Sequence, residues 1–155
     1  SKTLECQWAV VWQFHNGVTS IGGIPFIKMS VTHEYCDETV PPHSDLFQNM
    51  PISIFSDMLT QLMLERELRV NSDSTKYPVF ANLFKRDGVA CTYFVCIRNM
   101  KGNPIGILSA AYSKNKVFDE LFFEKLEGYS ARISLLLHQM KIHSEERRHE
   151  GRQQA

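Results

Sequence analysis

The sequence lacks an excess of charge of either sign, because 17 Lys and Arg residues balance 17 Asp and Glu residues over 155 positions. Binding to nucleic acid needs clustered positive charge, so we expect no nucleic-acid partner. Long apolar runs are also lacking, since polar residues interrupt them well short of the roughly 20 residues that cross a bilayer. The first residues, SKTLECQW, have neither the basic start nor the apolar core of a secretory signal. We therefore expect a cytoplasmic protein without membrane insertion.

Motifs of catalysis and metal binding are absent as well. The sequence has no CxxC pair, HExxH pattern, Gly-rich phosphate loop, serine-based triad or paired carboxylates at catalytic spacing. These absences favour a binding domain over an enzyme without excluding enzymatic activity. They indicate no metal site and no catalytic residues, and they leave any cofactor unknown.

Cysteine occurs at only four positions, which do not form an evident disulfide framework. Cys91 and Cys96 are five residues apart on one expected strand and would point to opposite faces. Cys6 and Cys36 are distant from both. We predict reduced, mostly buried thiols. Cys36, beside a proline-rich loop, is the one cysteine that we expect to be accessible for thiolate chemistry.

The most informative stretch is Val89 to Tyr112, in which two apolar runs flank a polar segment containing Gly102. This pattern predicts an antiparallel hairpin. Neither strand has a polar face, since Tyr93 and Phe94 would point to opposite sides. Such strands lie in the centre of a sheet that is covered on both faces.

Alternating apolar residues predict two further strands, at residues 6–14 and at about 24–35. The turn between them begins with His15 and Asn16, whose side chains together could hold a polar ligand, although Asn-Gly also suits a turn without one. His33 falls on the Met29 face of the second strand. This placement favours a hydrogen-bonded core histidine over a ligand contact.

The middle of the sequence mixes helical and extended patterns. Helical spacing begins at about Asp45, is interrupted at Pro51 and resumes through Met63. The polar run 70–76 predicts a surface loop. Residues 77–80 should be extended, because a residue before proline is pushed out of the helical region.

A long amphipathic helix is expected from the acidic pair Asp119-Glu120 to about Lys141. Its apolar residues recur at spacings of four and three, which suits a helix-helix seam. The expected dimer-interface residues are Phe122, Leu126, Ile133, Leu136 and Met140. Residues 143–155 have no apolar face and predict frayed helix, a linker or a disordered tail.

This order of elements resembles the GAF domain, a sensory and regulatory module related to PAS. The stretch GNPIGILSAAY followed by VFDELFFEKLEGYSARISLLL is similar to the last strand and closing helix of that family. The resemblance implies an α+β fold with a central antiparallel sheet of about five or six strands, helices on both faces and a long C-terminal helix. The domain would span residues 1–142, with 143–155 as a polar tail or linker.

The resemblance also implies a pocket on the sheet face away from the terminal helices. Members of the family use this pocket for cyclic nucleotides, bilins, haem or small metabolites, and others dimerise through their terminal helices. We therefore expect an unidentified small-molecule ligand and a homodimer through the C-terminal helix. The candidate ligand-binding residues are His15, Asn16, Phe26, His33, Phe55, Phe80 and Tyr93.

Two sharper ligand hypotheses rest on short motifs. Asn115-Lys116, Phe118 and Asp119-Glu120 resemble the NK…F…DE signature of cyclic-nucleotide-binding GAF domains, but the acidic pair follows the phenylalanine without the usual three intervening residues. Acidic residues also suit a helix N-terminus without any ligand. Bilin attachment would use a cysteine, and the Cys-His dipeptide of bilin-binding members is absent.

Three hypotheses about function follow. The first is a sensory GAF-like domain that binds a small molecule between the sheet and residues 41–68 and signals through its last helix. The second is a ligand-free module for homodimerisation or protein interaction. The third is a thiol-dependent oxidoreductase that uses Cys36 and Cys91 on a small oxidised substrate.

Overall fold

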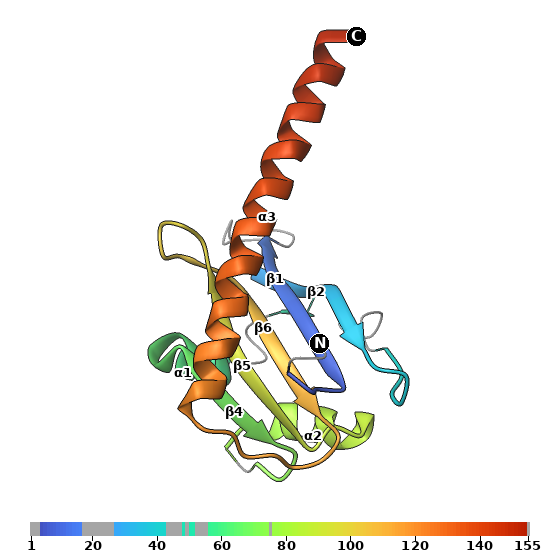
Figure 1. The fold of residues 1–155 in the computed structure, drawn as a ribbon, viewed down its shortest axis with the longest axis vertical. Helices are drawn as coiled ribbons and strands as arrows, with labels where there is room; N and C mark the ends of the chain where they lie inside the picture. The colour runs from blue at the N-terminus through green and yellow to red at the C-terminus, as the bar shows by residue number, and fades with distance from the viewer. Residues whose placement is uncertain are drawn as a thin grey trace, which may run out of the picture.

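A six-stranded antiparallel sheet forms the centre of the computed structural model, which describes residues 4–16, 27–42, 48, 50–51, 56–74 and 76–154. The strands are β1 (Trp8–Asn16), β2 (Ile27–Cys36), β3 (Met50–Pro51), β4 (Glu67–Asn71), β5 (Cys91–Arg98) and β6 (Pro104–Tyr112). The strand order is β3-β2-β1-β6-β5-β4, and Figure 1 labels all of these strands except β3. The helices are α1 (Ser56–Glu65), α2 (Pro78–Asp87) and α3 (Glu120–Gln154). The expected α+β fold is confirmed.

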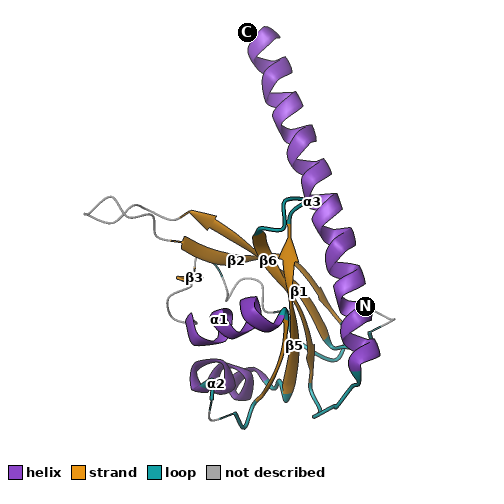
Figure 2. Ribbon diagram, turned by 90° about the vertical axis from the view of Figure 1, so that its left-hand side faces the viewer, coloured by secondary structure: helices purple, strands orange, loops and turns teal. Residues whose placement is uncertain are grey.

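Helices cover both faces of the sheet, with α1 and α2 on one side and α3 on the other (Figure 2). The alternation of β5 supplies both cores. Phe94 packs with Trp12 and Leu62 on the α1/α2 face, whereas Tyr93 packs with Leu126 on the α3 face. The predicted central hairpin, buried on both faces, is therefore confirmed.

β6 approaches β1 closely at Gly106. A Cβ atom there would lie 2.1 Å from the backbone oxygen of Trp12, so no larger residue fits without a shift of the sheet. At the end of the β5–β6 turn, Gly102 adopts a φ of +84°, a conformation that side chains disfavour.

Three local expectations between the second strand and the hairpin are wrong. Met50, expected in a helix, pairs with β2 as part of β3; residues 45–47, expected in the same helix, lie outside the described residues. Val70 and Asn71, expected in the surface loop, belong to β4 and pair with β5, and the loop begins only at residue 72. Pro78 begins α2 instead of an extended segment, because the first position of a helix needs no backbone N–H donor.

A register shift in β2 changes the expected place of His33. Trp12 pairs with Val31 but Val11 pairs with His33, which leaves Thr32 as an extra residue in β2. His33 therefore lies on the face opposite Val31, and the expectation of a core histidine is wrong. Its side chain is exposed, with Nδ1 3.0 Å from the Thr32 hydroxyl.

α3 continues as one helix to Gln154, so the residues after Ile142 are helical in the structure. Figure 1 shows the C-terminal half of α3 projecting beyond the sheet. The domain boundary expected at residue 142 stays a prediction. No helix within the described part of the chain combines the length and the apolar character needed to cross a membrane.

Candidate functional site

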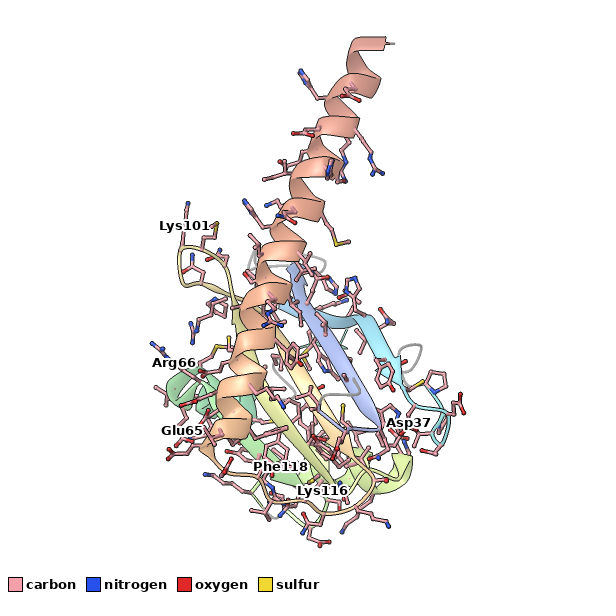
Figure 3. All side chains as sticks on the ribbon, in the orientation of Figure 1. Asp37, Glu65, Arg66, Lys101, Lys116 and Phe118 are labelled. Atoms are coloured by element: carbon pink, nitrogen blue, oxygen red, sulfur yellow. The ribbon has the colours of Figure 1, made fainter. Side chains whose placement is uncertain are left out.

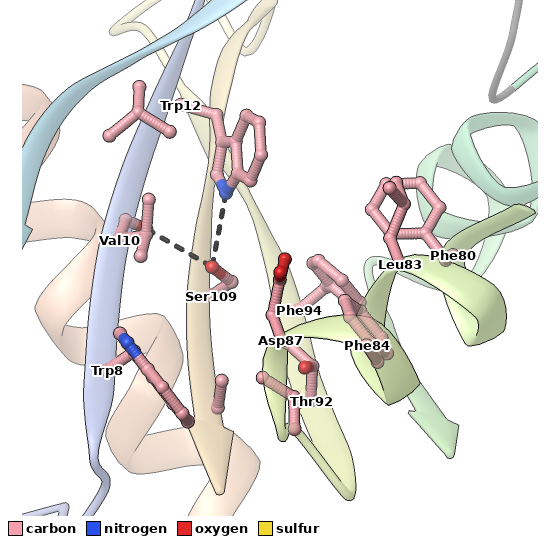
Figure 4. Close-up of a pocket in the computed structure, with 13 residues that line it drawn as sticks. Trp8, Val10, Trp12, Phe80, Leu83, Phe84, Asp87, Thr92, Phe94 and Ser109 are labelled. Atoms are coloured by element: carbon pink, nitrogen blue, oxygen red, sulfur yellow. Dashed lines mark hydrogen bonds between the residues drawn. The ribbon is translucent and has the colours of Figure 1, made fainter. Parts of the chain in front are cut away.

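A cavity of about 40 Å³ lies between α2 and the sheet, on the face away from α3 (Figure 4). The alternation of each strand turns every second side chain toward it. β1, β5, β6 and α2 all contribute to its wall. The residues that determine its chemistry are Trp8, Trp12, Phe80, Phe84, Asp87, Thr92, Phe94 and Ser109.

Aromatic rings form most of the apolar wall. Phe80 lies 5.5 Å from Phe84 and 5.7 Å from Phe94 between ring centroids, and Phe84 stacks on Phe94 at 6.4 Å with an interplanar angle of 21°. Both tryptophans of the chain, Trp8 and Trp12, lie on the β1 side. These mutual contacts fix the rings, so the wall is preformed.

Three of the N–H and O–H donors on the sheet side, those of Trp8, Trp12 and Ser109, already have hydrogen-bond partners. The Trp12 indole Nε1 donates to the Ser109 Oγ at 3.2 Å, and that hydroxyl in turn donates to the Val10 carbonyl at 3.5 Å. The Trp8 Nε1 donates to the Pro41 carbonyl at 2.9 Å. These groups therefore stabilise the wall and are not available to donate to a ligand.

Thr92 brings an unpaired hydroxyl to the cavity. Its side chain is buried, and its Oγ1 has no hydrogen-bond partner among the described residues. A buried polar group without a partner costs about 1–3 kcal/mol, so such atoms normally bind a water or a ligand. The Thr92 hydroxyl is thus the clearest indication that this cavity takes a guest.

Asp87 places a carboxylate in the same cavity (Figure 4), and its side chain is only 12% exposed. Gly88 ends α2 at this point in a left-handed conformation, with φ of +76°. A carboxylate in the last turn of a helix is opposed by the helix dipole. Arg86 offsets this charge in part through its Nε, 3.2 Å from the carboxylate. The stability of α2 therefore does not explain why position 87 is an acidic residue.

Among the expected ligand-binding residues that the structure describes, only Phe80 lines this cavity. Tyr93 lies on the α3 face, where its hydroxyl donates to the Lys116 carbonyl at 2.8 Å. His15 is half-buried, with Nε2 2.8 Å from the Ser30 hydroxyl. Asn16 ends β1 by pairing with residue 27, but its side chain is not described. Phe26 and Phe55 lie outside the described residues.

His33 lines a different and more open depression, between α3 and the sheet. This groove has a volume of about 830 Å³ and is also lined by Lys101 and His138. It lies on the α3 face, away from Phe80. The expected ligand residues that are described therefore do not converge on one site.

The segment that resembles the cyclic-nucleotide signature serves the structure of the α3 face. Arg69 donates to the Asn115 side chain and, at 2.9 Å, to the Lys116 carbonyl. Phe118 stacks on Phe122 at 4.2 Å, and its backbone N–H donates to the Tyr93 hydroxyl at 3.0 Å. Figure 3 shows Lys116 and Phe118 on the connection that leads into α3. These contacts hold the segment away from the cavity.

The four cysteines are dispersed over the fold, and three of them are buried. All four cysteines are described, none forms a disulfide, and only Cys36 is partly exposed. Burial raises the pKa of the Cys6 and Cys96 thiols. Cys91 packs on the α3 face and Cys36 beside the opposite core, so these two do not form a pair. The geometry gives the oxidoreductase hypothesis no support.

The expected dimer residues divide into two groups. Phe122 and Leu126 are buried against the sheet of their own chain, and Ile133 packs at the edge of the same cluster. Leu136 and Met140 are exposed, at 57% and 56%. The dimer interface stays a prediction, and only its C-terminal part has side chains open to a partner.

Several site residues are not among those expected from the sequence. The alternation of β1 does place Trp8 and Trp12 on one face, but alternation cannot tell which face carries a cavity. Thr92 is a single hydroxyl within the apolar run CTYFVCI, which is a weak indication of a buried polar contact. Asp87 precedes a glycine and is indistinguishable in sequence from a turn residue.

The sequence matches no protein-family model and no curated protein. Solved structures do share its fold. A phycoerythrobilin-bound GAF domain from a cyanobacterial phytochrome superposes with a TM-score of 0.69 and 13% identity, over 92% of this chain and 81% of that chain. The chain has a GAF-like fold.

Two further structures support the same GAF-like fold. The PixJ GAF domain of Thermosynechococcus elongatus, in its blue-light absorbing form, has a TM-score of 0.68 and 13% identity over 94% of this chain and 82% of that chain. A GAF domain/HD domain protein from Geobacter sulfurreducens has a TM-score of 0.64 and 14% identity over 91% and 86%. The resemblance found in the sequence is thus confirmed at the level of fold.

Proposed function

We propose that this GAF-like domain is a cytoplasmic sensory domain that binds a small molecule in the cavity under α2 and transmits binding to α3. The observation that carries the proposal is the buried Thr92 hydroxyl, which has no partner among the described residues and lines an aromatic cavity. Apolar pockets with a few polar anchors are the usual form of small-molecule sites. The bilin-bound GAF domain of similar fold supports a ligand of some kind.

The size of the cavity favours a ligand, or a ligand group, much smaller than a bilin. Sites for drug-sized molecules measure about 300–1,000 Å³. The cavity measures about 40 Å³. One water molecule needs about 10–15 Å³ of such space, so there is room for roughly three groups of that size.

β5 supplies the path from the cavity to α3. Thr92 faces the cavity, and the next residue, Tyr93, faces α3, where its ring lies 4.8 Å from Phe122. A ligand can shift α3 only if it stabilises one arrangement of this contact over another. The proposal therefore predicts a change in α3 on binding.

The experiment is native mass spectrometry of the protein purified from cells, first under gentle and then under denaturing conditions. A mass excess that disappears on denaturation, and that is lost in Thr92→Val, supports the proposal. Hydrogen exchange of α3 with and without the bound molecule tests transmission. A bound molecule that survives Thr92→Val, or that leaves α3 unchanged, would count against it.

Homodimerisation through the C-terminal part of α3 is the second proposal, favoured by the exposed Leu136 and Met140. Leu136→Asp is the suitable variant, because Ile133 also packs against the sheet of its own chain. Sedimentation should show association that depends on concentration and is lost in Leu136→Asp. Equal association of both proteins would exclude this interface.

A further inference from the structure

We infer that the cavity under α2 takes a small organic cation, such as a methylated ammonium group. The inference rests on the proposed function, because it names the chemical class of the ligand for the same site. Three features of the cavity wall support it: the polar atoms left open, the aromatic faces, and the charges at the wall.

Two polar groups of the cavity can accept hydrogen bonds from a ligand. The Asp87 carboxylate only accepts; its oxygens each accept from Arg86, at 3.2 and 3.4 Å, and keep further lone pairs. The Thr92 hydroxyl can accept as well as donate. The indole N–H groups of Trp8 and Trp12 and the Ser109 hydroxyl already donate elsewhere. A matching ligand therefore carries N–H or O–H donors or a positive charge.

The aromatic rings add attraction for the same kind of group. The negative face of an aromatic ring attracts a cation within about 6 Å, and ring clusters are a common means of binding methylated ammonium groups. Five aromatic side chains line this cavity, two of them indoles, which attract cations best. A hydrophobic ligand would use these rings, but it would leave the Asp87 carboxylate without a partner inside the cavity.

The charges at the wall disfavour anions. None of the described residues that line the cavity is Lys, Arg or His, so nothing there would neutralise a phosphate or carboxylate. Arg86 pairs with Asp87, but it does not line the cavity, and its side chain is 59% exposed. This arrangement argues against a cyclic nucleotide whose phosphate enters the cavity.

Three probes of equal size test the inference: trimethylammonium, isopropanol and acetate, each with four heavy atoms and each titrated at constant ionic strength. The indole N–H signals of Trp8 and Trp12 report binding by NMR, since both residues line the cavity. We expect saturable shifts with trimethylammonium, binding of isopropanol weaker by about tenfold or more, and no saturation with acetate.

Variants test whether the Asp87 carboxylate is responsible for the binding of trimethylammonium. Asp87→Asn should weaken trimethylammonium binding by about tenfold or more without changing that of isopropanol. Glu124→Gln, an exposed acid on α3, is the matched control and should change neither. If Asp87→Asn loses the native indole spectrum, Thr92→Val replaces it and should weaken trimethylammonium binding by a smaller factor.

Each other outcome overturns the inference. Equal binding of isopropanol and trimethylammonium, or tighter binding of acetate, would show a neutral or anionic site and leave the proposed function standing. Unchanged affinity in both variants would place the cation elsewhere. If no probe saturates and the native mass shows no bound molecule, the inference and the proposed function fail together.

Discussion

The two faces of the sheet differ in the hydrogen bonding of several buried hydroxyl groups. On the α3 face, the buried Tyr112 hydroxyl donates to the Leu4 carbonyl at 2.7 Å, and the Tyr93 hydroxyl to the Lys116 carbonyl at 2.8 Å. On the α1/α2 face, the buried hydroxyls of Tyr77 and Thr92 have no partner among the described residues. Each face also has an exception: the Ser109 hydroxyl is bonded on the α1/α2 face, and Asn71 Oδ1, at the position that pairs with Cys91 of the α3 face, has no partner among the described residues. Both faces are rich in aromatic residues, so composition alone does not separate them.

This difference indicates that the two faces have different roles. Around Tyr93 the α3 face is closely packed, and the Tyr93 ring contacts Phe118, Phe122 and Phe123 at ring-centroid distances between 4.8 and 5.4 Å. The groove lined by His33 lies elsewhere on this face. The opposite face keeps a cavity and an acid. A closely packed region contributes stability, whereas open polar atoms in a preformed cavity contribute binding.

The largest effect is expected where the α3 face is most tightly packed. Leu126 is fully buried, so Leu126→Ala should lower the free energy of unfolding by about 3 kcal/mol. Leu136→Ala, on the exposed side of the same helix, should change it by less than about 0.5 kcal/mol. Urea unfolding followed by circular dichroism measures both. Similar losses in the two variants would mean that α3 does not pack as described.

Removal of a partnered hydroxyl gives the next largest effect. Tyr112→Phe leaves the Leu4 carbonyl without its donor and should destabilise the protein by about 1–2 kcal/mol. The same urea experiment measures the loss. An unchanged midpoint would show that this hydrogen bond contributes nothing in solution.

The dependence of stability on pH should be smaller and confined to alkaline conditions. Burial raises the pKa of Tyr112 above its usual value of 10.0, and the nearby thiols of Cys6 and Cys91 add to the shift. Above about pH 10 the unfolded chain loses this proton while the folded chain keeps it, so the free energy of unfolding falls as pH rises.

The variant Tyr112→Phe isolates this effect. Buried thiols such as Cys96 also titrate late in the folded chain, but they do so equally in both proteins. Urea midpoints from pH 8.5 to 11 should therefore converge as the wild type loses stability faster than Tyr112→Phe. Parallel curves would mean that Tyr112 ionises as readily in the folded protein as in the unfolded chain.

The smallest expected effect on stability provides the sharpest test of the difference between the two faces of the sheet. Thr92→Val removes a hydroxyl that has no partner among the described residues, so the free energy of unfolding should stay within about 0.5 kcal/mol of the wild type or rise slightly. Set against Tyr112→Phe, this variant compares the loss of one hydroxyl on each face. A loss above about 1 kcal/mol would mean that Thr92 already has a structural partner.

The sequence predicts the parts of the fold in which a pattern is long and local. The hairpin of β5 and β6 and the amphipathic start of α3 are of this kind, because alternation and helical spacing extend over many residues. β4 is missed because its sequence, ELRVN, is short and contains two charged residues. It forms a strand through its pairing with β5, which the local sequence does not predict. The start of α2 is missed because Pro78 suits an extended segment and a helix start equally well.

The candidate site is harder to predict than the fold, because it depends on which faces meet. Thr32, an extra residue in β2, moves His33 to the other face of the sheet. No local sequence pattern predicts such a bulge. Tyr93 and Phe94 are equally apolar neighbours, and only the packing of α3 decides that Phe94 lines the cavity. Among the predicted ligand-binding residues within the described ranges, Phe80 is therefore the one that lines the cavity.

An X-ray structure of the protein as purified from cells, at a resolution that shows ordered water, tests the difference between the two faces most directly. The account predicts density in the cavity under α2 that is not protein and that lies within hydrogen-bond distance of the Thr92 Oγ1. Around Tyr93 and Tyr112 it predicts no such density. A cavity closed by side chains, with the Thr92 hydroxyl donating to a backbone carbonyl, would contradict the account.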